Sequence, residues 1–122
     1  LTEILQTLGA TVELIDPHPD WPDMVFTANA GIVHGREFVP AQFRHRERQG
    51  ETPLFTDWAA RHGFSILSPG DSLPALRTSA FEGAGDALYC GDTLFAGYLN
   101  RSDIGVHRFL SERFQCRVVS LE

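Results

Sequence analysis

Apolar residues along the chain gather in short runs, and the same order of runs occurs twice, roughly 55 residues apart. The first copy spans residues 26–41 with a turn at 34–35, and the second spans residues 81–97 with a turn at 91–92. A glycine stands in each turn, as tight hairpins require. Each copy is therefore predicted to form two antiparallel strands.

Each hairpin is followed by a segment with helical periodicity. Residues 51–62 and 103–114 carry apolar residues on one face, which are Leu54, Phe55, Trp58 and Ala59 in the first segment and Ile104, Val106, Phe109 and Leu110 in the second. The pair Ser102-Asp103 is typical of an N-cap and predicts where the second helix begins.

A third pattern, the end of a helix followed by a strand, occurs in residues 8–15, 62–68 and 114–120. Gly9 and Gly63 fit helix C-caps at the first two of these places. Each repeat is thus predicted to be strand, turn, strand, helix and strand.

Together these elements predict an α/β fold in one partial domain of 122 residues. Residues 17–68 and 69–122 would form two ββαβ units, and residues 1–16 would be the closing helix and strand of another. Units that repeat at this period suggest blades packed around a pseudo-symmetry axis. About two blades plus part of another would make an incomplete ring, with a sheet edge left exposed.

One stretch, PDMVFTANAG at residues 22–31, does not fit an ordinary core strand. Its centre, residues 24–27, has the composition of a buried strand. Asp23 precedes that strand, however, and Asn29 follows it among alanines and a glycine. An acid and an amide beside small residues favour a binding site over plain packing.

Composition narrows the class of protein. A formal net charge of -6 argues against nucleic acid or an anionic membrane surface as the main partner. No apolar stretch is long enough to span a membrane, and the chain opens without a signal peptide. Cys90 and Cys116 indicate reduced thiols in the cytoplasm, not a disulfide framework. The first residue is not methionine, which suggests a processed product or a fragment.

Two other kinds of site are disfavoured. The glycines at residues 83–85 are not followed by the lysine of a phosphate-binding loop. Acids and a histidine, His18, occur in residues 16–20, but such residues beside prolines are typical of a loop and do not indicate a metal site. The remaining histidines lack the spacing of metal ligands.

Three motifs in order, PDMVFTANAG, FEGAGDAL and GYLNRSD, resemble the guanidine-modifying (pentein) superfamily. Its members include dimethylarginine dimethylaminohydrolases, arginine deiminases and dihydrolases, and amidinotransferases. The resemblance covers nearly the whole chain. It implies a five-bladed α/β propeller of ββαβ units with substrate at the centre, and a reaction without metal or organic cofactor.

The resemblance also implies roles for individual residues. Asp23 would accept hydrogen bonds from the substrate guanidinium, and Glu82 matches the family's catalytic glutamate. Asp86 would help to order the site. Arg48 and Arg101 match arginines that bind the substrate carboxylate, for which the guanidinium fork is well suited.

Asn29 stands where dimethylarginine hydrolases carry an aspartate, and Ala28 where they carry a glutamate. The TANAG form is more similar to arginine dihydrolases or succinylarginine dihydrolases. A cationic guanidinium needs several acceptor oxygens, and short neighbouring residues would let the ligand approach the backbone. Asn29 is therefore expected to bind substrate.

In the family, a cysteine attacks the guanidinium carbon and a histidine acts as general acid and base, and both lie beyond the segment that matches Glu122. The chain is therefore expected to be the N-terminal portion of a hydrolase acting on arginine or a substituted arginine, inactive on its own. One alternative is a short non-catalytic module that binds an amino acid or forms homo-oligomers through its exposed edges. Another is a fragment of an amidinotransferase.

The carboxylates and the amide have simpler structural alternatives. Asp23 could form an Asx-turn, Asn29 could hold a left-handed kink, and Asp86 could close its loop. Glu82 lies between residues of a buried pattern, which favours a functional role.

The arginines have structural alternatives as well. Arg101 could pair with Asp103 at a helix start, and Arg48 lies in a charged run that could be a solvated face.

Overall fold

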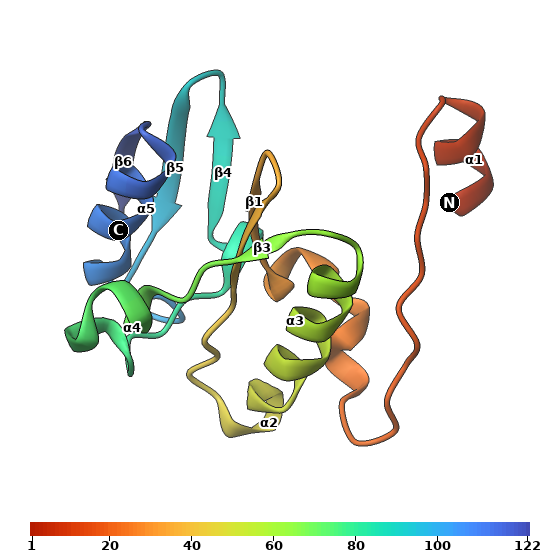
Figure 1. Ribbon diagram of the computed structural model, residues 1–122, viewed down its shortest axis with the longest axis horizontal. Coiled ribbons are helices and arrows are strands. Elements are labelled where there is room, and N and C mark those ends of the chain that lie inside the picture. The colour runs from red at the N-terminus through yellow and green to blue at the C-terminus, as the bar shows by residue number, and fades with distance from the viewer.

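The computed structural model describes residues 1–122 and contains two three-stranded sheets of the same topology, each with one long helix (Figure 1). In both sheets the first two strands are antiparallel and the third is parallel to the second. The first unit consists of β1 (Gly31–His34), β2 (Glu37–Pro40), α2 (Arg46–Gln49), α3 (Glu51–Arg61) and β3 (Ser65–Ile66). The second consists of β4 (Ala87–Cys90), β5 (Thr93–Gly97), α5 (Gly105–Phe114) and β6 (Arg117–Leu121).

The predicted strand–strand–helix–strand order is therefore confirmed in both units. The turns carry a left-handed glycine, with φ of 59° at Gly35 and 61° at Gly91. Gly63 ends α3 with φ of 79° and donates to the carbonyl of Ala60, as expected for a C-cap. The third such end has no glycine, and Gln115 adopts the left-handed conformation there.

The strand predicted at residues 24–27 is not formed. Two 3₁₀ helices occupy this stretch, η1 (Pro22–Val25) and η2 (Thr27–Ala30). Pro22 fixes its own φ near a helical value, and the amide of Phe26 then bonds back to the carbonyl of Asp23. Phe26 is 57% exposed, so apolar composition misled the prediction of a buried strand here.

The strand predicted within residues 8–15 is also not formed. The N-terminal helix α1 (Thr2–Thr7) buries none of its residues and stands apart from both units, joined to them by an extended segment (Figure 1). Leu14 in this segment is 79% exposed. A strand needs a hydrogen-bonded neighbour, and no strand lies beside this segment.

The N-cap predicted at Ser102-Asp103 is wrong too. Helix α5 starts two residues later, with Ile104 at the N-cap position and no side-chain cap. The side chains of Ser102 and Asp103 instead bond to the segment around Glu82, with Asp103 accepting from the amide of Ala80 at 2.7 Å.

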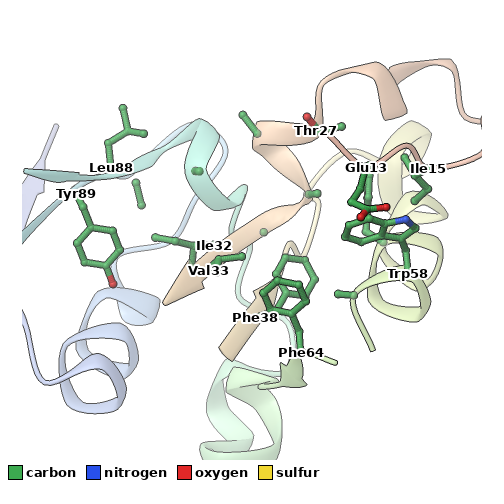
Figure 2. A pocket seen from close by; sticks show the side chains of 17 residues that line it. Glu13, Ile15, Thr27, Ile32, Val33, Phe38, Trp58, Phe64, Leu88 and Tyr89 are labelled. Carbon is green, nitrogen blue, oxygen red and sulfur yellow. The ribbon is translucent and has the colours of Figure 1, made fainter. Parts of the chain in front are cut away.

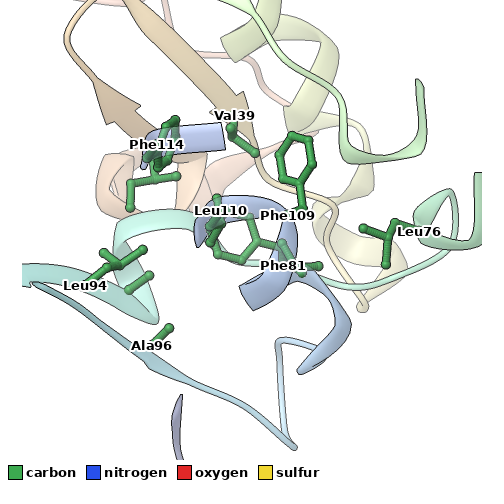
Figure 3. Close-up of a cluster of buried hydrophobic side chains, with 11 residues drawn as sticks. Val39, Leu76, Phe81, Leu94, Ala96, Phe109, Leu110 and Phe114 are labelled. Carbon is green, nitrogen blue, oxygen red and sulfur yellow. The ribbon is translucent and has the colours of Figure 1, made fainter. Parts of the chain in front are cut away.

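The two units share one hydrophobic core. Phe81, Leu94 and Leu110 of the second unit pack together with Ile32 and Val39 of the first (Figure 3). A smaller cluster of Met24, Ala30, Phe38, Phe55 and Ala59 lies under α3. The longest helix, α3, has 11 residues, and none of the helices could span a bilayer.

The connection between the units leads directly to Glu82. It contains the short helices α4 (Pro69–Ser72) and η3 (Pro74–Leu76) and ends at an antiparallel bridge between Gln42 and Phe81. The two bridge hydrogen bonds are 2.8 and 2.9 Å long. Because Phe81 is fixed in the shared core, the next residue, Glu82, is fixed at the boundary of the two units.

Candidate functional site

Two motif loops meet at this boundary. Helix η2, from PDMVFTANAG, packs against η4 (Gly83–Gly85), from FEGAGDAL. A Cβ on Gly83, whose φ is 57°, would lie 2.4 Å from the carbonyl oxygen of Gly31. A Cβ on Gly85 would lie 2.3 Å from the amide nitrogen of Asn29. Gly83 therefore lets the two loops approach each other backbone to backbone, and Gly85 leaves room for the side chain of Asn29.

Glu82 lies at the centre of the resulting polar cluster and is only 2% exposed. The side-chain amide of Asn29 donates to Oε2 of Glu82 at 3.0 Å. The backbone N–H of Glu82 donates to Ser102 Oγ, also at 3.0 Å. The guanidinium nitrogens Nη1 of Arg101 and Arg48 lie 3.4 and 3.9 Å from the same Oε2. An ionised carboxylate buried this deeply requires such partners.

Asp86 closes the second loop and lies beside Glu82. Its Oδ2 accepts from Ser102 Oγ at 2.7 Å, and its Oδ1 accepts from Arg101 Nη2. Arg101 thus contacts both carboxylates, although its side chain is 44% exposed. Ser102, which is 1% exposed, connects the backbone of Glu82 to the carboxylate of Asp86.

Arg48 reaches the cluster from α2. Its Nε and Nη2 donate to the two carboxylate oxygens of Glu51 at 2.8 and 2.7 Å, and Nη2 also donates to the carbonyl of Asp23 at 3.1 Å. The ring of Phe43 lies 4.3 Å from the guanidinium carbon. The hydrogen bonds to Glu51 raise the pKa of Arg48 above its ordinary value, against the opposing effect of burial.

The structure thus brings five of the predicted residues together: Asn29, Arg48, Glu82, Asp86 and Arg101. Asp23 lies at the margin of this cluster. Its carboxylate is exposed, and only its backbone carbonyl contacts Arg48.

Three structural alternatives do not hold. Asn29 is not in the left-handed region. The side chain of Arg48 is 12% exposed and does not belong to a solvated face. Arg101 pairs with Asp86, whereas Asp103 pairs with Arg44 at 2.6 Å. The polar side chains therefore bind one another across segments that lie far apart in the sequence.

Sequence reasoning missed two members of the cluster. Glu51 lies three residues after Arg48, a spacing that allows an ion pair on a helix, but the charged run around it hid its complete burial. Ser102 has the sequence pattern of a helix cap, which conceals its place in the cluster.

The cluster is suited to a planar organic cation. It contains three carboxylates (Glu51, Glu82 and Asp86) against two guanidinium groups (Arg48 and Arg101). An excess of negative charge at low exposure favours a cationic ligand, and Asn29 adds an amide oxygen as a further acceptor. No group of three or more His, Cys, Asp or Glu side chains has the arrangement of a metal site.

A separate apolar hollow of about 500 Å³ lies between the two units (Figure 2). Phe38 and Phe64 line its middle, Ile15 and Trp58 one end, and Tyr89 the other. None of the polar cluster residues lines it. Burial and the neighbouring Cys116 raise the pKa of Tyr89 to about 12.

Known proteins resemble the chain over most of its length. It is 46% identical over 114 residues to the bifunctional arginine dihydrolase/ornithine cyclodeaminase ArgZ of Synechocystis sp., covering 92% of this chain and 15% of that protein. It is 36% identical over 115 residues to the N(G),N(G)-dimethylarginine dimethylaminohydrolase of Mycobacterium tuberculosis, covering 94% of this chain and 35% of that one. No protein-family model matches the chain.

Among solved structures, the N-terminal domain of ArgZ, an arginine dihydrolase from Cyanobacteria, bound to substrate, superposes with a TM-score of 0.84 and 43% identity. The match covers 98% of this chain and 44% of that domain. The chain therefore spans less than half the length of these relatives. The two three-stranded sheets, the buried Glu82 with its partners and these similarities agree: over nearly its whole length the chain is similar to members of the guanidine-modifying (pentein) superfamily.

Proposed function

We propose that this chain is the N-terminal portion of a hydrolase that cleaves a C–N bond of arginine or a substituted arginine. The observation that carries the proposal is the burial of Glu82 beside Asn29, in a cluster with more carboxylates than guanidinium groups. Such a cluster favours a cation with several N–H donors. The similarity to ArgZ, which is named for its arginine dihydrolase activity, supports arginine as the ligand.

In this proposal Glu82, Asp86, Asn29 and Asp23 accept hydrogen bonds from the substrate guanidinium. Arg101 has a half-exposed side chain and turns from Asp86 toward the substrate carboxylate. Arg48 binds the same carboxylate. Glu82 also supports proton transfer at the guanidinium, which its position inside the cluster allows.

The chemistry requires a nucleophile and a general acid/base that the family carries outside these 122 residues. A cysteine thiolate attacks the guanidinium carbon, a nitrogen leaves with a proton from a histidine, and water hydrolyses the amidino-cysteine intermediate. Residues 17–68 and 69–122 would be two blades of the propeller, with residues 1–16 belonging to another.

Turnover of L-arginine by the full-length protein tests the proposal. The expected result is release of ammonia, with dimethylarginine a poorer substrate because Asn29 replaces an aspartate. Glu82→Gln should lower kcat by about 100-fold or more, whereas Asp92→Asn, an exposed carboxylate on a hairpin turn, should not change it. Absence of both arginine binding and ammonia release would refute the hydrolase. Transfer of the amidino group to an added amine would instead indicate an amidinotransferase.

A second candidate is a non-catalytic module that assembles with copies of itself. The apolar hollow and the exposed apolar residues of α1, Ile4 and Leu5, favour it. A natural 122-residue product that forms a concentration-dependent oligomer and releases no ammonia would support this candidate over the hydrolase. Sedimentation at several concentrations measures the association.

A further inference from the structure

Glu51 is the most completely buried acid of the chain, with 0% exposure. It is the first residue of α3, separated from the last residue of α2 by Gly50. The ring of Trp21 covers this junction so closely that a Cβ on Gly50 would lie 1.9 Å from a ring carbon. A carboxylate with no exposure to water is stable only when it is fully paired.

Its partner is Arg48 alone, which commits most of its donors to the interaction. Of the five N–H groups of Arg48, Nε–H and one of Nη2 bind Glu51, and the second of Nη2 binds the carbonyl of Asp23. The Phe43 ring covers one face of the guanidinium at 4.3 Å. Only Nη1 keeps uncommitted protons.

That remaining nitrogen points at the polar cluster. Nη1 of Arg48 lies 3.9 Å from Oε2 of Glu82, beyond direct hydrogen-bonding distance. A substrate group that enters between Arg48 and Glu82 would therefore meet a single nitrogen of Arg48. The two-nitrogen fork that an arginine usually offers to a carboxylate is already occupied by Glu51.

We propose that Glu51 is a positioning residue, which fixes Arg48 so that Nη1 alone is presented to the carboxylate of the amino-acid substrate. This role rests on the proposed function, in which Arg48 binds that carboxylate. Glu51 contacts no reacting atom and acts through Arg48. Its loss should therefore weaken recognition of the carboxylate while the guanidinium end of the site stays intact.

The test compares L-arginine with agmatine, which has the same guanidinium but no carboxylate, in the full-length protein. In Glu51→Gln, one carboxylate oxygen becomes an amide N–H₂ that opposes an Arg48 donor. KM for arginine should rise about 10-fold or more, as expected when a charged hydrogen bond is lost. The KM of agmatine, or its inhibition constant if it turns over too slowly, should change by less than about 2-fold, and kcat for arginine should change little.

A matched control is Glu112→Gln, which removes the acid of an exposed helical pair with Arg108 and should change neither ligand's affinity. If Glu51→Gln does not fold, Glu51→Asp keeps the buried charge but is one methylene too short for both hydrogen bonds, and it should give the same split. Parallel weakening of arginine and agmatine would show that the pair only supports the fold, and would overturn the role. Failure of the unaltered protein to bind arginine would remove the proposed function and this role with it.

Discussion

Ser102 provides the sharpest test of how the polar cluster is held together. Its hydroxyl accepts the backbone N–H of Glu82 at 3.0 Å and donates to the ionised Asp86 at 2.7 Å, at 1% exposure. Ser102→Ala removes a hydrogen bond to a charged group and leaves a buried N–H without a partner. The first effect costs about 2 kcal/mol and the second at least about 1 kcal/mol, so unfolding should become easier by about 3 kcal/mol.

Urea unfolding of the intact protein, followed by circular dichroism, measures this change. The matched control is Ser111→Ala in α5. This change removes one neutral hydrogen bond, 2.8 Å long, to the carbonyl of Cys116. It should cost about 1 kcal/mol. If Ser102→Ala costs no more than Ser111→Ala, Ser102 does not hold Glu82 and Asp86 in place, and the account of the cluster is wrong.

Three further predictions concern the loops and their pH dependence. Gly83→Ala should cost about 3 kcal/mol or more in urea unfolding because it combines a left-handed φ with a backbone clash, whereas Gly35→Ala, with a similar φ and open space, should cost about 1 kcal/mol. Burial lowers the pKa of His107 in the folded protein, so the unfolded chain binds a proton at a higher pH than the folded protein does. Stability should be level above about pH 6.5 and fall below it, and His107→Gln should abolish that fall in unfolding curves measured against pH. Asn29→Asp would set a second carboxylate beside Glu82, and like charges repel most when both groups are ionised, so its loss of stability should be larger at pH 8 than at pH 5.

Hydrophobic periodicity was sufficient to predict the two longer helices and the two hairpins. The helical face of residues 51–62 and the two hairpins were predicted because their own spacing encodes them. The stretch at residues 24–27 has the composition of a strand and still forms 3₁₀ turns, because Pro22 and the packing of Asn29 against the second loop decide its backbone. Residues 10–16 have a strand's pattern but no neighbouring strand to pair with.

The candidate site was predictable in residue type but not in its contacts. Family motifs pointed to Glu82, Asp86 and Arg101, and these do cluster. Glu51 could not be recognised, because a glutamate in a charged run usually faces solvent, whereas here the fold buries it completely beside Arg48. Pairing across the fold is a property of tertiary packing, which local sequence does not encode.

The position of the site follows from the repeat. Each unit carries a loop just before its first strand, η2 in one and η4 in the other, and both loops are rich in small residues. The shared core and the bridge at Phe81 bring these equivalent loops face to face, so Asn29 from one unit meets Glu82 from the other across 53 residues of sequence. Neither unit alone contains both groups. Substitutions that loosen the contact between the units, such as Gly83→Ala, should therefore weaken binding of a guanidinium ligand even though they alter no polar side chain of the cluster.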